Sequence, residues 1–397
     1  MDASLLFISG MFRSGTTLLG RMLNAHHKIS VASDPYFDFF KCYRSTIGNK
    51  LGLRLGTTEP LGDYYFSSND ARLLHEILDS DLDLPFYESD RILLTKEIFS
   101  RAKIYSPIIC KFLGSAVKGE TYKEVLDNLL DILAMAYGKQ DCQYIGFKEV
   151  WANEFIPALA YAYPEARFIQ IIRDPRAVSA SKNAKNTCYP WLFLGRQWRK
   201  LTALSWLNQQ NQTIHERVLT LLYEDLVNDT TRTIKELCRF LEIDYSEEMA
   251  RPGNFIDGSG QQWRQNTNYG VGGISFDTQA TQRWKTILSK AEQNLIEFLC
   301  YPEMALYGYK PDHEPQMDEG VLIFPPLVPA ERLAEWIKNA MPNDPLNTVL
   351  DLSHEEIRYA LLNMKQDKFE KADEELVNSS FLDLQIANAI RKIRAVT

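Results

Sequence analysis

The sequence predicts an α/β fold, in which a parallel sheet is flanked by helices and followed by an α-helical C-terminal extension. Two observations predict this class. First, a short apolar run that ends in glycine leads directly into a segment with helical spacing, and this order of strand, turn and helix returns twice along the chain. Second, residues 330–397 show only amphipathic helical patterns. Repeated strand–helix units typically form parallel sheets with right-handed crossover connections.

The first strand–helix unit lies at the N-terminus. Residues 4–9 form an apolar run that is too short for a helix and is typical of a strand buried on both faces. After the turn at 11–15, apolar residues at helical spacing predict a helix that begins near Thr16. We therefore expect a strand, a glycine-bounded turn and a helix in direct succession.

Two further units have the same order. Residues 166–172 predict a strand, and Arg173-Asp174-Pro175 predicts a turn into a helix with proline at its first position. Residues 217–223 predict a third strand, followed by a helix that is entered through Asn228-Asp229.

The remaining segments complete the predicted organisation. Helical patterns also cover 65–79, 120–137, 151–163, 190–214, and 278–300 with a break at Pro302. The glycine- and asparagine-rich residues 253–277 predict a lid or binding loop. Prolines gathered in 311–329 predict a linker between a main domain, 1–310, and the helical extension, 330–397, whose helices are a candidate surface for homo-oligomer formation.

Composition narrows the function classes. Among 397 residues, 45% are hydrophobic and the net charge is −8, which excludes a disordered chain and makes nucleic acid a poor partner. The N-terminus has no basic region, and every apolar run is broken well before 18 residues, so we expect no signal peptide, anchor or membrane partner. The six scattered cysteines and the lone histidines favour neither a disulfide framework nor a metal site, and we expect a cytoplasmic protein with reduced thiols.

A glycine-containing turn between strand and helix suggests a P-loop-like phosphate site. In residues 10–17, Gly-Met-Phe-Arg-Ser-Gly-Thr-Thr, the two glycines have the spacing of G-x-x-x-x-G-K-[ST], but Thr16 stands where that motif has lysine. Backbone N–H groups and a helix N-terminus here would face an anion, with Arg13 supplying positive charge. We expect an anion shorter than a triphosphate; the alternative is a tight turn that binds nothing.

Several segments together resemble a known family. Residues 12–19 resemble the 5′-phosphosulfate loop of sulfotransferases that use 3′-phosphoadenylyl sulfate (PAPS), and residues 168–181, a strand ending in Arg173 with Ser181 eight residues on, resemble their 3′-phosphate motif. Tyr223-Glu224-Asp225-Leu226 resembles the family's Y-E-D-L segment, and 273–275 with 282–285 resembles its G-I-S…RW-K stretch. The resemblance covers about 1–310.

Two departures place the chain within the family. Leu18 replaces a tryptophan of the steroid and phenol enzymes, and their R-K-G loop is absent, with Gln262-Trp263-Arg264-Gln265-Asn266 in that region. The chain is therefore more similar to the tyrosylprotein, carbohydrate and bacterial natural-product branches.

The resemblance implies PAPS as donor, no metal, and a specific set of binding residues. The donor contacts that it implies are Arg13, Ser14, Gly15, Thr16, Thr17, Arg173, Ser181, Tyr223, Trp263 and Arg264. Lys148 matches a lysine near the sulfuryl group and, with Arg13, is the expected catalytic cation. Two alternatives stay open: Arg-Asp-Pro as a plain helix entry, and Lys148 as a solvated lysine paired with Glu149.

Asp34 is the expected catalytic base. The resemblance places the family's carboxylate about twenty residues after Arg13, where this chain has the shorter Asp34. The alternative is that Asp34 caps a helix that begins at Pro35, and Glu149 is the substitute base if Asp34 has no catalytic role. His26 and His27, at the end of the first helix, are expected to pack or cap rather than react.

The acceptor is expected to be a small-molecule alcohol, phenol or amine, such as a bacterial secondary metabolite. The negative net charge and the absence of a long Lys/Arg run disfavour sulfated polysaccharides. The aromatics of 35–66 and 191–206 either wall an acceptor pocket or belong to the core. Two other functions stay open: a nucleotide kinase or phosphotransferase of the same fold, and a catalytically inactive nucleotide-binding scaffold.

Overall fold

The computed structural model describes residues 3–53, 55, 68–183, 188–263, 276–312, 329–333, 335 and 353–395, and divides the chain into two compact units. The first comprises Met1–Pro60, Glu76–Ile172 and Asn208–Thr278; the second comprises Leu61–His75, Arg173–Leu207 and Gln279–Thr397. Helix α3 (Ser68–Leu78) passes from the second unit into the first. No helix of the described residues is both long and apolar enough to span a membrane.

A five-stranded parallel sheet forms the centre of the first unit. Its strands, in spatial order, are β2 (Ile29–Ser33), β3 (Tyr144–Val150), β1 (Ser4–Gly10), β4 (Arg167–Ile172) and β5 (Val218–Leu222). This confirms the predicted fold class. The three predicted strands correspond to β1, β4 and β5, whereas β2 was not predicted, because its sequence Ile-Ser-Val-Ala-Ser is short and only half apolar.

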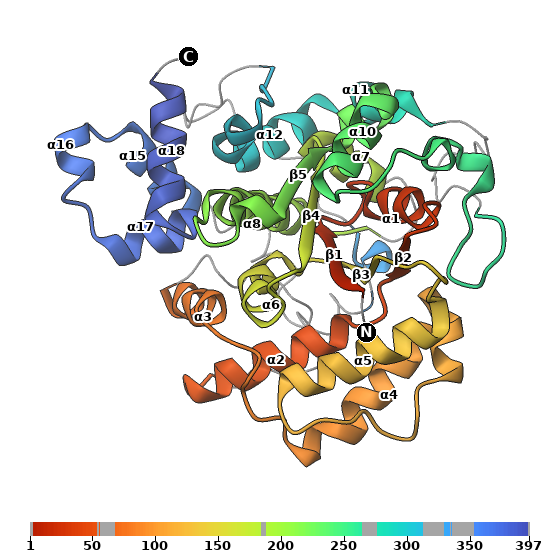
Figure 1. Ribbon diagram of the computed structural model, residues 1–397. Coiled ribbons are helices and arrows are strands. Elements are labelled where there is room, and N and C mark those ends of the chain that lie inside the picture. The colour runs from red at the N-terminus through yellow and green to blue at the C-terminus, as the bar shows by residue number, and fades with distance from the viewer. Residues whose placement is uncertain are drawn as a thin grey trace. The chain divides into compact units, whose positions relative to one another are not determined.

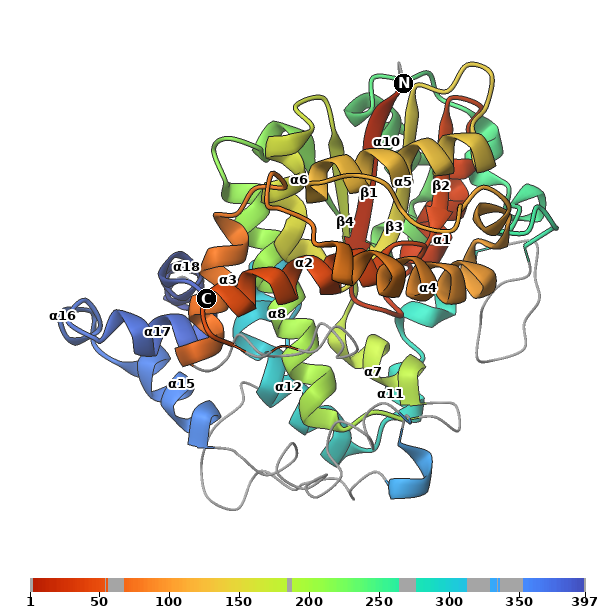
Figure 2. The same cartoon turned by 90° about the horizontal axis from the view of Figure 1, so that it is seen from below.

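Helices cover both faces of this sheet. Figures 1 and 2 show α5 (Tyr122–Tyr137) on one face, and α1 (Thr16–Asn24) and α10 (Thr230–Phe240) on the other. The other helices of the unit are α2 (Phe37–Lys50), α4 (Glu88–Tyr105), α6 (Ile156–Ala162) and α9 (Tyr223–Asn228). The predicted helices at 120–137 and 151–163 are thus present as α5 and, shortened, α6.

Aromatic rings fill the space between the sheet and α2. The ring of Phe7 on β1 lies 5.4 Å from that of Phe147 on β3 and 5.8 Å from that of Phe40 on α2. Tyr36, Phe37, Phe39, Phe40 and Tyr43 are each at most 4% exposed. These residues are therefore core, which was the alternative to an acceptor pocket; Tyr64, Tyr65 and Phe66 lie outside the described residues.

The second unit is helical. It contains α7 (Pro175–Asn183), most of α8 (Trp191–Gln210), α11 (Trp284–Ile287), α12 (Lys290–Met304), α15 (Ser353–Asn363), α16 (Gln366–Phe369), α17 (Glu374–Phe381) and α18 (Leu384–Arg394). The described helices of the predicted extension thus share one unit with α7, α8 and α12. Most of the predicted linker, 313–328, lies outside the described residues.

Buried ion pairs connect the extension to the earlier helices of this unit. Arg199 of α8 donates to Glu355 of α15 at 2.6 Å, and Arg358 of α15 pairs with Glu303 of α12. All four side chains are at most 1% exposed. The two arginines lower the pKa of Glu355 to about 2 against the opposing effect of burial. Breaking such a pair leaves an uncompensated charge in the interior.

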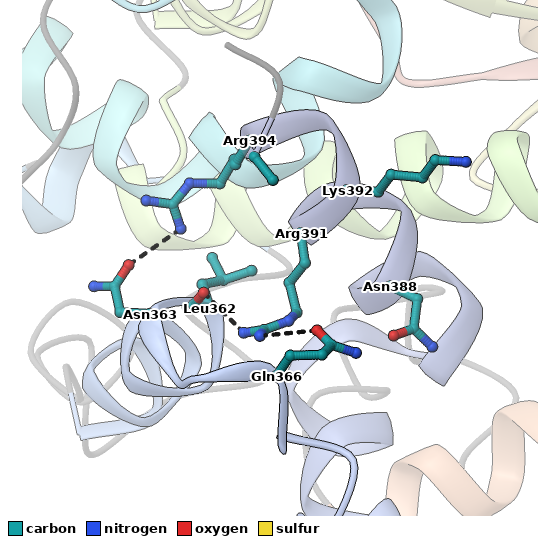
Figure 3. A pocket seen from close by; sticks show the side chains of 8 residues that line it. Leu362, Asn363, Gln366, Asn388, Arg391, Lys392 and Arg394 are labelled. Atoms are coloured by element: carbon teal, nitrogen blue, oxygen red, sulfur yellow. Dashed lines mark hydrogen bonds between the residues drawn. The ribbon is translucent and has the colours of Figure 1, made fainter. Parts of the chain in front are cut away.

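A pocket of about 610 Å³ lies against α15 and α18 (Figure 3). Arg391 of α18 donates to the carbonyls of Leu361, Leu362 and Met364 and to Gln366 Oε1. These are the carbonyls that a helix leaves without intrahelical partners at its C-terminal end. Arg391 therefore caps the C-terminal end of α15, which gives this basic residue of the pocket a structural role.

Pro302 does not end its helix, contrary to the sequence prediction. Helix α12 continues to Met304, although proline has no N–H to donate to the carbonyl of Phe298 four residues earlier. The hydroxyl of Tyr359 on α15 donates to that carbonyl instead, at 2.7 Å. The helix can therefore contain proline because a side chain from the extension replaces the missing donor.

Tyr359→Phe should destabilise the protein by about 1–2 kcal/mol, because it leaves the Phe298 carbonyl without a donor in the interior. Urea denaturation measures the loss. Tyr161→Phe, at a side chain that is 73% exposed, is the control and should change nothing. Equal stability of the two variants would show that the Phe298 carbonyl is satisfied in another way.

Candidate functional site

The predicted phosphate loop lies between β1 and α1, at the carboxyl edge of the sheet. Ser14 N–H donates to the Met11 carbonyl at 3.1 Å, and Arg13 and Gly15 have left-handed φ values of 65° and 92°. Gly15 is the N-cap of α1 and no side chain caps that helix end. Its first turn carries no acidic residue, so the N-terminal amides and the helix dipole favour an anion.

Two features of the loop fit a phosphate-type ligand. The hydroxyl of Ser14 is buried and makes no hydrogen bond with any described residue, as a group kept for a ligand would be. A Cβ at Gly15 would collide with the ring of Tyr223, so the backbone can approach closely there only without a side chain. Thr16, 3% exposed, and Thr17 begin α1 directly after this turn.

Tyr223 brings the Y-E-D-L segment to the loop. It is the first residue of α9, directly after β5, and is 7% exposed. Its ring is the group that a Gly15 side chain would strike. Two segments that are 208 residues apart (223 − 15) in the sequence therefore meet within the first unit.

Asp34 and Lys148 form an ion pair at the same edge of the sheet. Lys148 is opposite Ser33 of β2 and Ile8 of β1, and its ammonium group contacts the Asp34 carboxylate. Asp34 N–H also donates to the Lys148 carbonyl at 2.7 Å. Lys148 is 1% exposed, so the alternative of a solvated lysine paired with Glu149 is wrong.

The helix-cap alternative for Asp34 is also wrong. Helix α2 begins at Phe37, its N-cap is Tyr36, and no side chain caps it. Asp34 instead has a left-handed φ of 46°, and its Oδ1 atom is buried without a hydrogen bond from the described residues. One oxygen of its carboxylate thus contacts Lys148, and the other has no hydrogen-bond partner among the described residues.

Glu149 is the residue that sequence reasoning undervalued. It is fully buried, and its Oε1 accepts a hydrogen bond from Tyr36 N–H. Burial raises the pKa of Glu149 well above its ordinary value, and the negative charge of Asp34 raises it further. The sequence signal was the Lys-Glu pair at the end of a strand, where successive side chains point to opposite faces.

Arg173 and Ser181 belong to the second unit, where they flank the start of α7. Arg173 directly follows β4 in the chain; its Nη2 donates to the Ala280 carbonyl at 2.6 Å, and its own carbonyl accepts from Trp198 Nε1 at 2.8 Å. Ser181 lies in the second turn of α7 and is 8% exposed. Both residues thus have fixed places on one strand–turn–helix element.

The neighbouring Arg176 contacts Trp284, the tryptophan of the R-W-K stretch. It pairs with Asp174 at 2.7 Å and with Glu297 of α12 at 2.7 Å, and its guanidinium lies 4.0 Å from the centre of the Trp284 ring. The hydrogen bonds that Arg176 donates to both carboxylates raise its pKa despite burial. Trp284 thus packs on α7 and supports the element that bears Arg173.

The remaining predicted residues divide into two groups. The backbone N–H of Trp263 donates to the Phe255 carbonyl at 2.7 Å, and the two rings lie 6.2 Å apart. Arg264 and 273–275 lie outside the described residues. His26 is buried and its ring bonds to the Asp244 carbonyl at 2.9 Å, as expected for a packing histidine.

Comparison with known proteins identifies the family of this chain. The model of the sulfotransferase family matches residues 6–247. Carbohydrate sulfotransferase 2 of Mus musculus is 31% identical over 99 residues, 25% of this chain and 18% of that protein. Carbohydrate sulfotransferase 3 of Tetronarce californica is 26% identical over 204 residues, 45% of each protein. This chain therefore spans less than half the length of either relative.

One solved structure is among the proteins that are similar to this chain. The sulfotransferase domain from the curacin biosynthetic pathway is 17% identical, covers 74% of this chain and 96% of that domain, and superimposes with a TM-score of 0.43. The family model alone spans more than half of the chain, including the phosphate loop, Asp34, Lys148, Arg173 and Tyr223. The chain belongs to the sulfotransferase family.

Proposed function

We propose that the protein transfers the sulfuryl group of PAPS to a hydroxyl or amine of a small-molecule acceptor. The observation that carries this proposal is the Asp34–Lys148 pair at the edge of the sheet where the phosphate loop also lies. In parallel sheets, ligands bind outside the carboxyl ends of the strands. A base, a cation and an anion-binding loop at one such edge are what transfer of an anionic group needs.

The residues would divide the work as follows. Arg13, Ser14, Gly15, Thr16 and Thr17 would hold the 5′-phosphosulfate through side chains and loop amides. Arg173 and Ser181 would hold the 3′-phosphate, and Tyr223, with Trp263 and Arg264, would contact the nucleotide. Charge-assisted contacts of this kind are the strong ones in phosphate recognition.

Asp34 would take the proton of the acceptor during transfer. PAPS supplies the sulfuryl group: an acceptor oxygen or nitrogen bonds to sulfur while the bond from sulfur to the 5′-phosphate oxygen breaks, releasing 3′-phosphoadenosine 5′-phosphate. Lys148 and Arg13 would offset the charge that develops on the sulfuryl group and the leaving phosphate. Because side chains supply these charges, we expect transfer without a divalent metal ion.

Calorimetry with 3′-phosphoadenosine 5′-phosphate and with ATP tests the donor. Binding of the bisphosphate but not of ATP supports the proposal. Preference for ATP would favour a kinase, and bisphosphate binding without transfer to any acceptor would favour an inactive scaffold. In an acceptor screen, turnover of heparan-like chains in preference to every small alcohol, phenol and amine would overturn the small-molecule acceptor.

Arg173→Ala should weaken bisphosphate binding by about 2–4 kcal/mol, through loss of a charged phosphate contact. Isothermal titration measures the change. Arg167→Ala is the matched control, because Arg167 lies at the other end of β4, where it pairs with the exposed Glu242 at 2.9 Å. Unchanged affinity in Arg173→Ala would refute the 3′-phosphate assignment.

Gly15→Ala should abolish tight bisphosphate binding, because the added Cβ meets the Tyr223 ring and the φ of 92° is strained for alanine. Gly52→Ala separates the two causes: Gly52 also has a positive φ, of 77°, but has open space around its Cβ position. The control should lose some stability and keep its affinity. Equal bisphosphate affinities in both variants would show that the close approach of the phosphate loop to Tyr223 has no role in binding.

Asp34→Asn should lower turnover by about 10²–10⁴-fold, because a base acts on the acceptor proton in the transition state. Bisphosphate affinity should stay nearly constant. Asp244→Asn is the control; its side chain is 94% exposed, lies 3.8 Å from Lys28, and should not affect turnover. Wild-type turnover in Asp34→Asn, measured with the melting temperature, would remove Asp34 from the mechanism.

A further inference from the structure

Glu149 has no role in the proposed transfer, yet it directly follows Lys148 in the chain and is fully buried. Its side chain is 0% exposed. One carboxyl oxygen accepts the hydrogen bond from Tyr36 N–H, and the other, Oε2, has no hydrogen-bond partner among the described residues. A buried carboxylate in this state would be costly, so the group must be explained by a proton or by a function.

Consecutive residues of β3 hold the turn that contains Asp34 from two sides. Lys148 accepts Asp34 N–H with its carbonyl and contacts the Asp34 carboxylate with its ammonium group. Glu149 holds Tyr36 N–H, on the far side of Pro35. Asp34 has a left-handed φ of 46°, which is unfavourable for a residue with a side chain and persists only when its surroundings fix it. The Glu149 bond is one of these fixing contacts.

Burial favours the neutral form of Glu149, and the surrounding charges act in both directions. Burial is the larger cause of its raised pKa, and the charge of Asp34 is the second. Arg101 of α4 and Lys148 act in the opposite direction, as does the bond from Tyr36 N–H. Arg101 also forms an ion pair with Asp38 at 3.7 Å. The Tyr36 hydroxyl donates to the Leu129 carbonyl. The net result is that the pKa of the Glu149 carboxyl is raised well above its ordinary value, which favours the protonated form.

We propose that Glu149 is a positioning residue for Asp34, the base that takes the proton of the acceptor. As a neutral acid, Glu149 fixes the turn from Asp34 to Tyr36 and does not compete with Asp34 for the ammonium group of Lys148. An ionised Glu149 would compete for Lys148 and place a second negative charge near the transferred group. Its buried place also makes Glu149 unsuitable as the base itself. The proposal rests on the proposed sulfuryl transfer for its kinetic consequences, but not for the protonation of Glu149.

Two variants separate the hydrogen bond from the charge. Glu149→Gln keeps an oxygen that accepts Tyr36 N–H and cannot ionise; its turnover at neutral pH should stay within about threefold of wild type. Glu149→Met has a similar volume and no such acceptor; its turnover should fall by about 10–100-fold with unchanged bisphosphate affinity, because the base is misplaced. Wild-type turnover should also decline at high pH as Glu149 loses its proton, and Glu149→Gln should lack that decline.

Thermal melting tests the protonation without any activity. When the pKa of a carboxyl is raised in the folded state, the folded protein loses stability as pH rises above 4.5, the pKa of that carboxyl in the unfolded chain. The reason is that the unfolded chain releases the proton more easily. The melting temperature of Glu149→Gln should therefore increase relative to that of the wild type as pH rises from about 4.5 toward the pKa of Glu149 in the folded protein. Glu242→Gln, at a side chain that is 72% exposed, is the control and should show no such trend.

The outcomes are distinguishable. A melting gap that does not change with pH would show that Glu149 is ionised in the fold and would overturn the proposal. If the gap grows but wild type and Glu149→Gln have the same pH profile, or Glu149→Met keeps full turnover, then Glu149 has only a structural role and the inference fails. Absence of bisphosphate binding in the wild type would instead refute the proposed function.

Discussion

The parallel pairing of β1 with β3 is the constraint on which the site depends. A Cβ at Gly146 would collide with the backbone of Leu6, so the two strands can pair in this register only because residue 146 has no side chain. That pairing sets Lys148 opposite Ile8, two residues before the phosphate loop begins at Gly10. The spacing between the loop and the ammonium group is therefore fixed by backbone hydrogen bonds rather than by flexible side chains.

The site gathers charge in a chain that is acidic overall. The net charge is −8, yet the phosphate loop combines Arg13 with an uncapped helix N-terminus, and the neighbouring Lys148 is buried. An anion at the loop would lie near Arg13 and the helix N-terminus, and charges this close outweigh the screened field of distant ones in salt solution. The acidic composition makes long polyanions poor candidates as general partners, and it is compatible with a small anionic donor.

Motif and periodicity were enough to predict β1, α1, β4 and β5, because each combines a buried apolar run with a characteristic turn. They were not enough for β2, where the hydrophobic signal is weak and pairing with β3 decides the structure. The neutral, buried Glu149 could not be predicted either, since its contact with Tyr36 joins residues 113 positions apart. Pro302 was misread for the same reason: Tyr359, which replaces its missing donor, lies far along the chain.

The ion pairs between the extension and α8 and α12 have a consequence for shortening the protein. A chain that stopped at residue 310 would retain Arg199 and Glu303 but lose Glu355 and Arg358, their charged partners in the interior. It would also expose apolar surface, because Phe298 stacks on Tyr359 with ring centres 4.9 Å apart. The family motifs end well before these contacts begin, so the length of the motif region is not the length of the folding unit.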